Sequence, residues 1–274
     1  MLGKLLKHEF HATGRVMWVI YVAMLGLSVM GRLALKGLDM VDVWPQPVRA
    51  MMMLVLVAWV LSLVIGGVAT VVLLVKRFHK NLLTDEGYLM FTLPCSVHHL
   101  VIAKIIAAAV WTVATICVIA LSMLIALVGE EILIGVRAMI GFVFYGSFTA
   151  LDAINGVTII LEIIILMLLG SAGSCLQFYS AMSIGHGFTS HKVLWSVVVY
   201  FIQNIVLQIL SVVLVVTPLS YVGEHLTSPN WLDTISPVQA WHMGVLGICA
   251  MEVIVGAVFY ILTVVNLQKR LNLA

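Results

Sequence analysis

Residues 76–104, KRFHKNLLTDEGYLMFTLPCSVHHLVIAK, are the longest polar interruption in a chain that is otherwise strongly apolar, and this contrast decides the fold. The stretch begins with a basic cluster, continues with an acidic pair, and then has a short apolar run at residues 88–93. Long apolar runs lie on both sides of it. We therefore expect it to connect two membrane spans outside the bilayer, and we call residues 76–99 the elbow.

The composition indicates an integral membrane protein. Of the 274 residues, 63% are hydrophobic and only 9% are charged, whereas soluble domains have roughly 25% charged residues. Several runs reach the ~20 residues that a helix needs to cross the hydrocarbon core, and their continuous apolar character favours helices over a β-barrel. We predict an all-α polytopic bundle with six spans, at about residues 16–35, 51–75, 100–128, 154–184, 193–216 and 241–267.

The N-terminal segment, residues 1–15, has an apolar stripe opposite a basic face. This pattern predicts an amphipathic helix in the headgroup layer, or else the charged flank of the first span. Residues 16–274 then form the transmembrane domain. Residues 129–152 are read as an extension of the third span, a re-entrant segment or an interfacial helix.

The distribution of Lys and Arg sets the expected orientation, because positive residues are enriched in cytoplasmic loops. Ten of the 14 Lys and Arg residues fall on the side of the termini and the elbow. Both termini and the elbow are therefore predicted to be cytoplasmic, and residues 218–240 extracellular. The net charge of +2 is too small to indicate a nucleic-acid partner. The ten are Lys4, Lys7, Arg15, Lys76, Arg77, Lys80, Lys104, Lys192, Lys269 and Arg270.

Within the elbow, the residue order predicts a short helix. Thr84 is a candidate N-cap, and Asp85 and Glu86 would lie at the positive end of the helix dipole. Apolar residues follow as far as Phe91, and Pro94 ends the helix. Such a helix either docks another protein through its exposed aromatic residues or is a turn tucked under the bundle.

The sequence KNLLTDEGYLMFTLP at residues 80–94 resembles the corresponding segment of bacterial ABC exporter permeases of the type-2 class, especially those of Firmicutes. The start MLGKLLKHEF, the turn SIGHGFTSHK and the end NLQKRLNL are similar to the same family. The resemblance implies a coupling helix that fits a cleft on an ATPase subunit, and extracellular helices within residues 218–240. The coupling residues it implies are Asp85, Glu86, Gly87, Tyr88 and Phe91.

The sequence contains no GxxxxGK[ST] motif to cradle ATP phosphates. We therefore expect no enzymatic activity and no cofactor in this chain, with ATP and Mg²⁺ bound by a separate ATPase subunit. One six-span half cannot enclose a pathway alone, so a second permease is expected, either an identical copy or a related chain. The predicted function is export of an amphipathic or cationic peptide, drug or lipid across the bacterial cell membrane by alternating access.

Polar residues inside the predicted spans are candidates for a substrate path. Charged residues are costly in the membrane and usually face a bundle interior or a wet cavity. Counted from the outer end of their predicted spans, Glu162 and Glu252 each lie roughly 12–17 Å deep at 1.5 Å per residue. The alternative is that these residues only hold helices together. The candidates are Glu162, Asn204, Gln208, Ser211 and Glu252.

Other chemistry has weaker support, and we expect no metal site. Glu130 and Glu131 with Arg137 resemble the motif of intramembrane CAAX-type proteases, but the arginine is two residues too far along.

Two histidine-containing groups are also considered. Cys95 with His98 and His99 lacks further cytoplasmic ligands for a metal ion. His186 and His191 flank a short turn.

Two other functions remain open on the sequence. One is a non-transporting membrane sensor or assembly factor that docks a soluble protein through the elbow. The other is a secondary transporter that uses Glu162 and Glu252 as proton sites. Dependence of transport on ATP separates the exporter from both.

Overall fold

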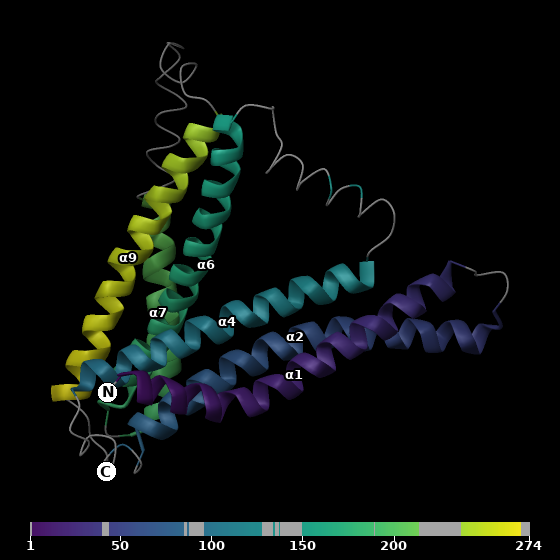
Figure 1. The fold of residues 1–274 in the computed structure, drawn as a ribbon. Coiled ribbons are helices and arrows are strands. Elements are labelled where there is room, and N and C mark those ends of the chain that lie inside the picture. The colour runs from purple at the N-terminus through teal and green to yellow at the C-terminus, as the bar shows by residue number, and fades with distance from the viewer. Residues whose placement is uncertain are drawn as a thin grey trace. The chain divides into compact units, whose positions relative to one another are not determined.

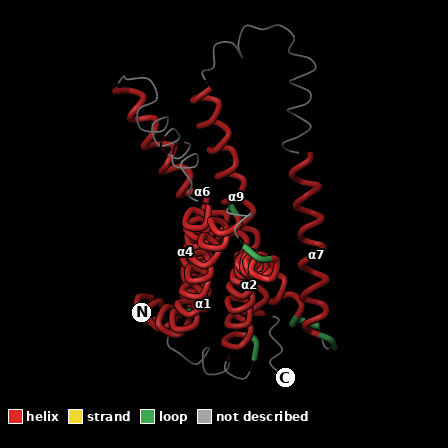
Figure 2. The backbone as a smooth tube through the Cα atoms, turned by 90° about the vertical axis from the view of Figure 1, so that its right-hand side faces the viewer, coloured by secondary structure: helices red, strands yellow, loops and turns green. Residues whose placement is uncertain are grey.

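The fold is all-α in the part of the chain that the computed structural model describes. That part comprises residues 2–39, 44–84, 87, 96–127, 134, 137, 150–188, 190–213 and 237–269. Figure 2 shows long helices and only a few short loops among the described residues. The helices are α1 (Leu2–Leu38), α2 (Gln46–Leu82), α4 (Val97–Leu127), α6 (Ala150–Gly185), α7 (Lys192–Ser211) and α9 (Pro237–Lys269).

These six helices are all long and apolar enough to cross a membrane, which confirms the prediction of a polytopic all-α protein. Several helices extend beyond the predicted spans. The predicted N-terminal helix and first span form one unbroken α1 of 37 residues, and α2 continues through the basic start of the elbow to Leu82. Backbone hydrogen bonding continues where apolar character stops, so hydropathy underestimates helix length.

The chain divides into two compact units, and each contact between helices described below lies within one of them. The first unit is Met1–Arg77 with Ile102–Ile160, and the second is Phe78–Val101 with Leu161–Ala274. Figure 1 shows α1, α2 and α4 running alongside one another in the first unit, and α6, α7 and α9 in the second.

The first unit is held by one apolar cluster and several polar bonds. Met24, Trp59, Leu63 and Ala126 form the buried cluster, with one or two side chains from each of α1, α2 and α4. Trp59 also donates its indole N–H to the hydroxyl of Ser122 at 3.1 Å. Bonds of this kind hold membrane helices together with energies of about 0.6–1.7 kcal/mol each.

The second unit packs α6 against α7 through aromatic and polar pairs. The rings of Phe178 and Tyr200 stack with centroids 4.5 Å apart. The amide nitrogen of Gln203 donates to the hydroxyl of Ser180 at 3.0 Å, and Ser180 is fully buried. These contacts fix which face of α7 is turned toward α6.

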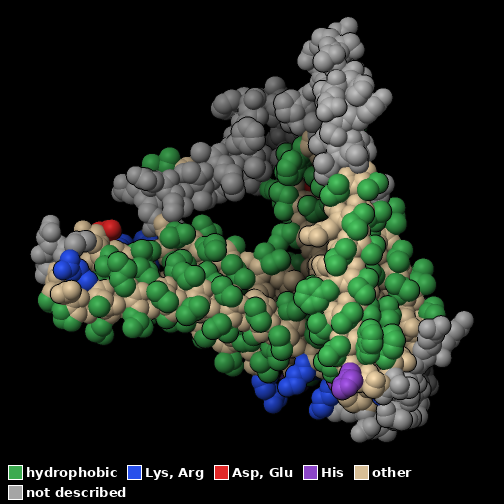
Figure 3. All heavy atoms as spheres, turned by 180° about the vertical axis from the view of Figure 1, so that it is seen from behind, with side chains coloured by type: hydrophobic (Ala, Val, Ile, Leu, Met, Phe, Trp, Pro, Cys, Tyr) green, Lys and Arg blue, Asp and Glu red, His purple; other side chains and the backbone are tan. Residues whose placement is uncertain are grey.

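Large apolar side chains cover the outside of the helices in both units. Trp18, Val19 and Leu54 are 67%, 70% and 70% exposed, and Figure 3 shows hydrophobic side chains over most of the visible described surface. A water-soluble protein rarely exposes apolar area on this scale. The surface is that of a protein surrounded by lipid.

Candidate functional site

Both ends of the elbow are held by side-chain contacts within the second unit. At the end of α2, the ring of Phe78 stacks on Tyr179 of α6 with centroids 4.0 Å apart and planes within 8°. Phe78 and Tyr179 are only 1% and 2% exposed. At the start of α4, Nδ1 of His98 lies 2.7 Å from the hydroxyl of Tyr260 on α9. The elbow is thus anchored to α6 on one side and to α9 on the other.

A histidine pair lies beside the first anchor. Nε2 of His79 is 3.1 Å from Nε2 of His186, and Nδ1 of His186 is 2.9 Å from the carbonyl oxygen of Met182. A carbonyl only accepts, so His186 carries its proton on Nδ1 and His79 donates to its Nε2. Burial, His79 and Lys192 lower the pKa of His186, while its hydrogen bond to Met182 opposes this.

The elbow itself is described only in part. Of the five predicted coupling residues, Gly87 is described, and it is buried, with its N–H donating to the carbonyl of Thr84 at 2.7 Å. The hydroxyl of Thr84 donates to the backbone carbonyl of Lys80 near the end of α2. Thr84 is therefore bonded to the helix that precedes it. The other four, Asp85, Glu86, Tyr88 and Phe91, lie outside the described residues.

A half-open pocket of about 250 Å³ is lined by α6, α7 and α9. It contains two of the predicted path residues, Ser211 and Glu252, together with three residues of α6 that sequence analysis did not assign to a path, Gly173, Ser174 and Gln177. The remaining lining is apolar. It consists of Leu207, Ile248, Met251, Val255 and Phe259.

Two features make the pocket polar at one side. A Cβ placed on Gly173 would lie 2.8 Å from Oε2 of Glu252, so the glycine provides the room that this carboxylate occupies. Gln177 is 9% exposed, and within the described part of the chain its amide nitrogen has no hydrogen-bond partner. In the sequence, Gly170, Gly173 and Ser174 have the spacing of small residues that let helices approach closely, which indicates packing and does not single out Gln177.

The other predicted path residues lie elsewhere or bond locally. Glu162 accepts from the indole N–H of Trp241 at 3.1 Å and contacts Nδ1 of His242 at 2.6 Å. It is therefore level with the beginning of α9, whereas Glu252 comes ten residues after His242, about 15 Å further along that helix. The two acids do not share one layer. Counting from predicted span ends cannot reveal this, because it ignores the stagger between α6 and α9.

The remaining two candidates, Asn204 and Gln208, take part in hydrogen bonds within α7. The amide nitrogen of Asn204 donates to the carbonyl of Tyr200 at 2.9 Å. Gln208 is exposed, and its carbonyl accepts from the hydroxyl of Ser211 at 2.8 Å. Their part in a substrate path stays a prediction.

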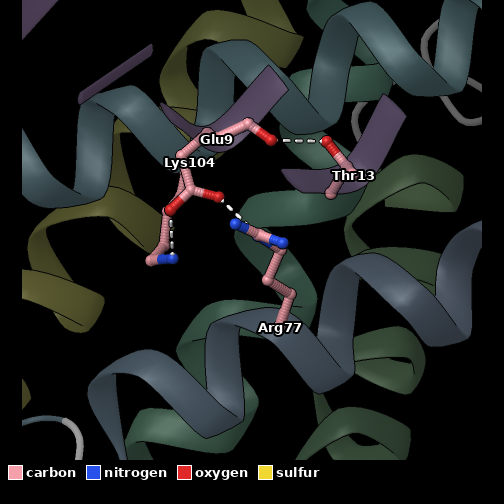
Figure 4. A network of polar contacts seen from close by, with 4 residues as sticks. All are labelled: Glu9, Thr13, Arg77 and Lys104. Atoms are coloured by element: carbon pink, nitrogen blue, oxygen red, sulfur yellow. Dashed lines mark hydrogen bonds and ion pairs between the residues drawn. The ribbon is translucent and has the colours of Figure 1, made fainter. Parts of the chain in front are cut away.

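A buried ionic cluster in the first unit was missed by sequence analysis (Figure 4). The carboxylate of Glu9 bonds to Nε of Arg77 at 2.7 Å and to Nζ of Lys104 at 2.8 Å, and its backbone carbonyl accepts from Thr13. Glu9 lies on the packing face of α1 with Thr13, seven residues after Leu2. The seven-residue spacing from Leu2 could have indicated that Glu9 faces the other helices. The basic residues around it instead led to the prediction of a helix in the headgroup layer.

This cluster joins the start of α1, the late part of α2 and the early part of α4. These three positions lie at one end of the first unit, as expected when successive spans alternate in direction. It also accounts for two of the ten basic residues that set the predicted orientation.

The described residues contain no group of three or more His, Cys, Asp and Glu side chains suited to a metal ion. Glu130, Glu131 and Cys95 lie outside the described part of the chain. His186 pairs with His79 and not with His191, which precedes α7 with φ of 51°.

Comparison of the chain with protein-family models, curated proteins and solved structures finds no match in any of the three. What stands is a polytopic membrane protein with six long apolar helices.

Proposed function

We propose that this chain is the transmembrane permease subunit of an ATP-driven ABC exporter in the bacterial cell membrane. The observation that carries the proposal is the double anchoring of the elbow. Phe78 is stacked on α6 and His98 is bonded to α9, and these helices line the pocket that contains Glu252. A push on the elbow would therefore be transmitted directly to the pocket walls.

The proposed assembly contains two permease chains and two ATPase subunits that carry ATP and Mg²⁺. Asp85, Glu86, Tyr88 and Phe91 would dock the ATPase, together with the buried Gly87. Closure of the ATPase pair would move both elbows, and the anchored helices would switch between inward- and outward-facing states as rigid bodies. The amphipathic stretch at residues 1–15 and both termini would lie on the cytoplasmic side.

The test uses co-expression with a P-loop ATPase of the ABC class from the same genome, followed by affinity purification. Reversing both charges at Asp85 and Glu86 should abolish co-purification, because a rim of unlike charge would become one of like charge. Asp39→Lys, at the opposite end of α1–α2, is the matched control and should retain it. Unchanged association in the charge-reversed elbow would refute this docking mode.

Transmission is tested separately from docking. Phe78→Ala removes the ring that stacks on Tyr179 while leaving residues 85–91 intact. We expect this variant to retain the ATPase but to lose ATP-dependent conformational change, measured as a change in accessibility of Glu252→Cys to a thiol reagent in a background without the four native cysteines. ATP-dependent labelling equal to that of the parent would contradict the lever.

A proton-coupled transporter is the second candidate, because Glu252 lines a pocket within the span-length α9. In that case uptake or efflux would occur in vesicles that contain no ATPase and would require a proton gradient. Glu252→Gln would abolish this transport. A non-transporting sensor would need neither ATP nor a gradient.

A further inference from the structure

We propose that the pocket lined by α6, α7 and α9 is a binding site for a protonated amine carried on a small apolar body. The role of such an amine as cargo rests on the proposed exporter function, but its binding does not. The argument comes from the one described glutamate that the chain itself leaves without a partner.

Three glutamates are described, and two of them have hydrogen-bond or ion-pair partners within the chain. Glu9 bonds to Arg77 and Lys104, and Glu162 bonds to Trp241 and His242. No hydrogen bond or ion pair to Glu252 occurs within the described residues, although it lies well inside α9 and lines the pocket. A carboxylate in a membrane span is expensive unless a cation accompanies it.

The other polar groups of the pocket define what the cation must offer. The hydroxyls of Ser174 and Ser211 donate to backbone carbonyls of their own helices at 2.8 Å, so toward the pocket they are acceptors. The amide nitrogen of the buried Gln177 is an unused donor. A ligand that fits carries several N–H donors for these acceptors, and an acceptor atom within reach of Gln177 would add one further bond without being required for binding.

The size and walls of the pocket limit the rest of the ligand. About 250 Å³ is below the ~300–1,000 Å³ of sites for drug-sized molecules. Five apolar side chains complete the lining, among them the aromatic ring of Phe259, whose face can contact a cation. The pocket therefore suits an ammonium head with a short carbon chain, and a longer chain would have to leave it.

The test is equilibrium dialysis of radiolabelled hexylamine against the purified full chain in phosphatidylcholine nanodiscs at pH 7, with empty nanodiscs as background. We expect saturable binding of hexylamine and none of hexanol. Glu252→Gln, which keeps size and shape, should weaken binding at least about tenfold, because a charge-assisted hydrogen bond is lost. Glu162→Gln removes an equal charge outside the pocket and should leave binding unchanged.

A second variant probes the geometry without changing charge. Gly173→Ala should weaken binding because its Cβ would displace the carboxylate of Glu252, whereas Gly170→Ala has open space and should not. Thermal unfolding of each variant reports that the fold is intact. Adding phosphatidylethanolamine to the nanodiscs distinguishes the source of the amine, since competition with hexylamine would show that the lipid head group also enters the site.

Three results would overturn the proposal: hexylamine binding no greater than to empty nanodiscs, equal binding of hexanol, or equal loss in Glu252→Gln and Glu162→Gln. Because the assay contains no ATPase, its failure leaves the exporter proposal standing. Conversely, failure of ATPase co-purification leaves the amine site standing.

Discussion

Neutralising Glu9 is the sharpest perturbation of the first unit. Glu9→Gln keeps the shape of the side chain and one acceptor oxygen but removes the charge that faces Arg77 and Lys104. The side chains of Glu9 and Lys104 are 9% and 4% exposed, whereas that of Arg77 is 22% exposed. Breaking a buried ion pair from one side costs about 3–5 kcal/mol. Water can compensate Arg77 in part, so we expect a loss near the lower limit, about 3 kcal/mol.

The measurement is reversible unfolding in mixed micelles, titrated with a denaturing detergent and followed by tryptophan fluorescence. Lys7→Gln is the matched control, because Lys7 is an exposed charge two residues away on the same helix. Its effect should stay within about 0.5 kcal/mol. If Glu9→Gln is as mild as this control, the cluster does not hold the three helices together.

A double-mutant cycle then assigns the loss to the pair. Lys104→Met replaces the buried cation by an apolar chain of similar length. Combined with Glu9→Gln, it should destabilise by less than the sum of the two single changes, with a coupling of about 0.5–3 kcal/mol. Strict additivity would place the effect outside the bond between these two residues.

Three further predictions concern the second unit. Phe78→Ala should cost about 3 kcal/mol of unfolding free energy, since its fully buried ring is lost, whereas Phe201→Ala, 61% exposed, should cost far less in the same titration. The lowered pKa of His186 favours its neutral form in the fold. Its contribution to stability is therefore complete above the ordinary histidine value of about 6.5 and is lost as the pH falls from there through the lower pKa of the folded state. His186→Asn should reduce this pH dependence of unfolding without removing it, because burial also lowers the pKa of His79. Gly185→Ala would put a Cβ 2.5 Å from a backbone nitrogen at the start of α7 and should lower the thermal midpoint, whereas Gly170→Ala, with nothing within 4 Å, should not.

Hydropathy by itself predicted a polytopic membrane protein and the six span-length helices that the structure describes. Crossing hydrocarbon requires about 20 consecutive apolar residues with every backbone group bonded inside the segment. This requirement is local in sequence, so six apolar runs predict six helices without any tertiary information. The polar start of the elbow was assigned to a loop, yet α2 extends through Phe78 and His79 to Leu82. There Phe78 stacks on Tyr179 of α6, and His79 contacts His186 just after the end of α6.

The polar residues show where sequence reasoning ends. Ser211 and Glu252 come together in one pocket, but Glu162 pairs with the beginning of α9. Helical periodicity gives the face of a residue on its own helix; the stagger between two helices depends on side chains that pack from both. Gln177 and Gly173 were not distinguishable from packing residues for the same reason.

The sequence alone therefore predicted six segments that are long and apolar enough to span a membrane, because that property is additive along the chain. Only the tertiary structure decided which charges are satisfied. Glu9 is enclosed by two cations from α2 and α4, and Glu252 is left facing a pocket. Whether a buried carboxylate has a partner depends on residues brought close by packing, often a hundred positions away, and no local pattern in the sequence records that distance.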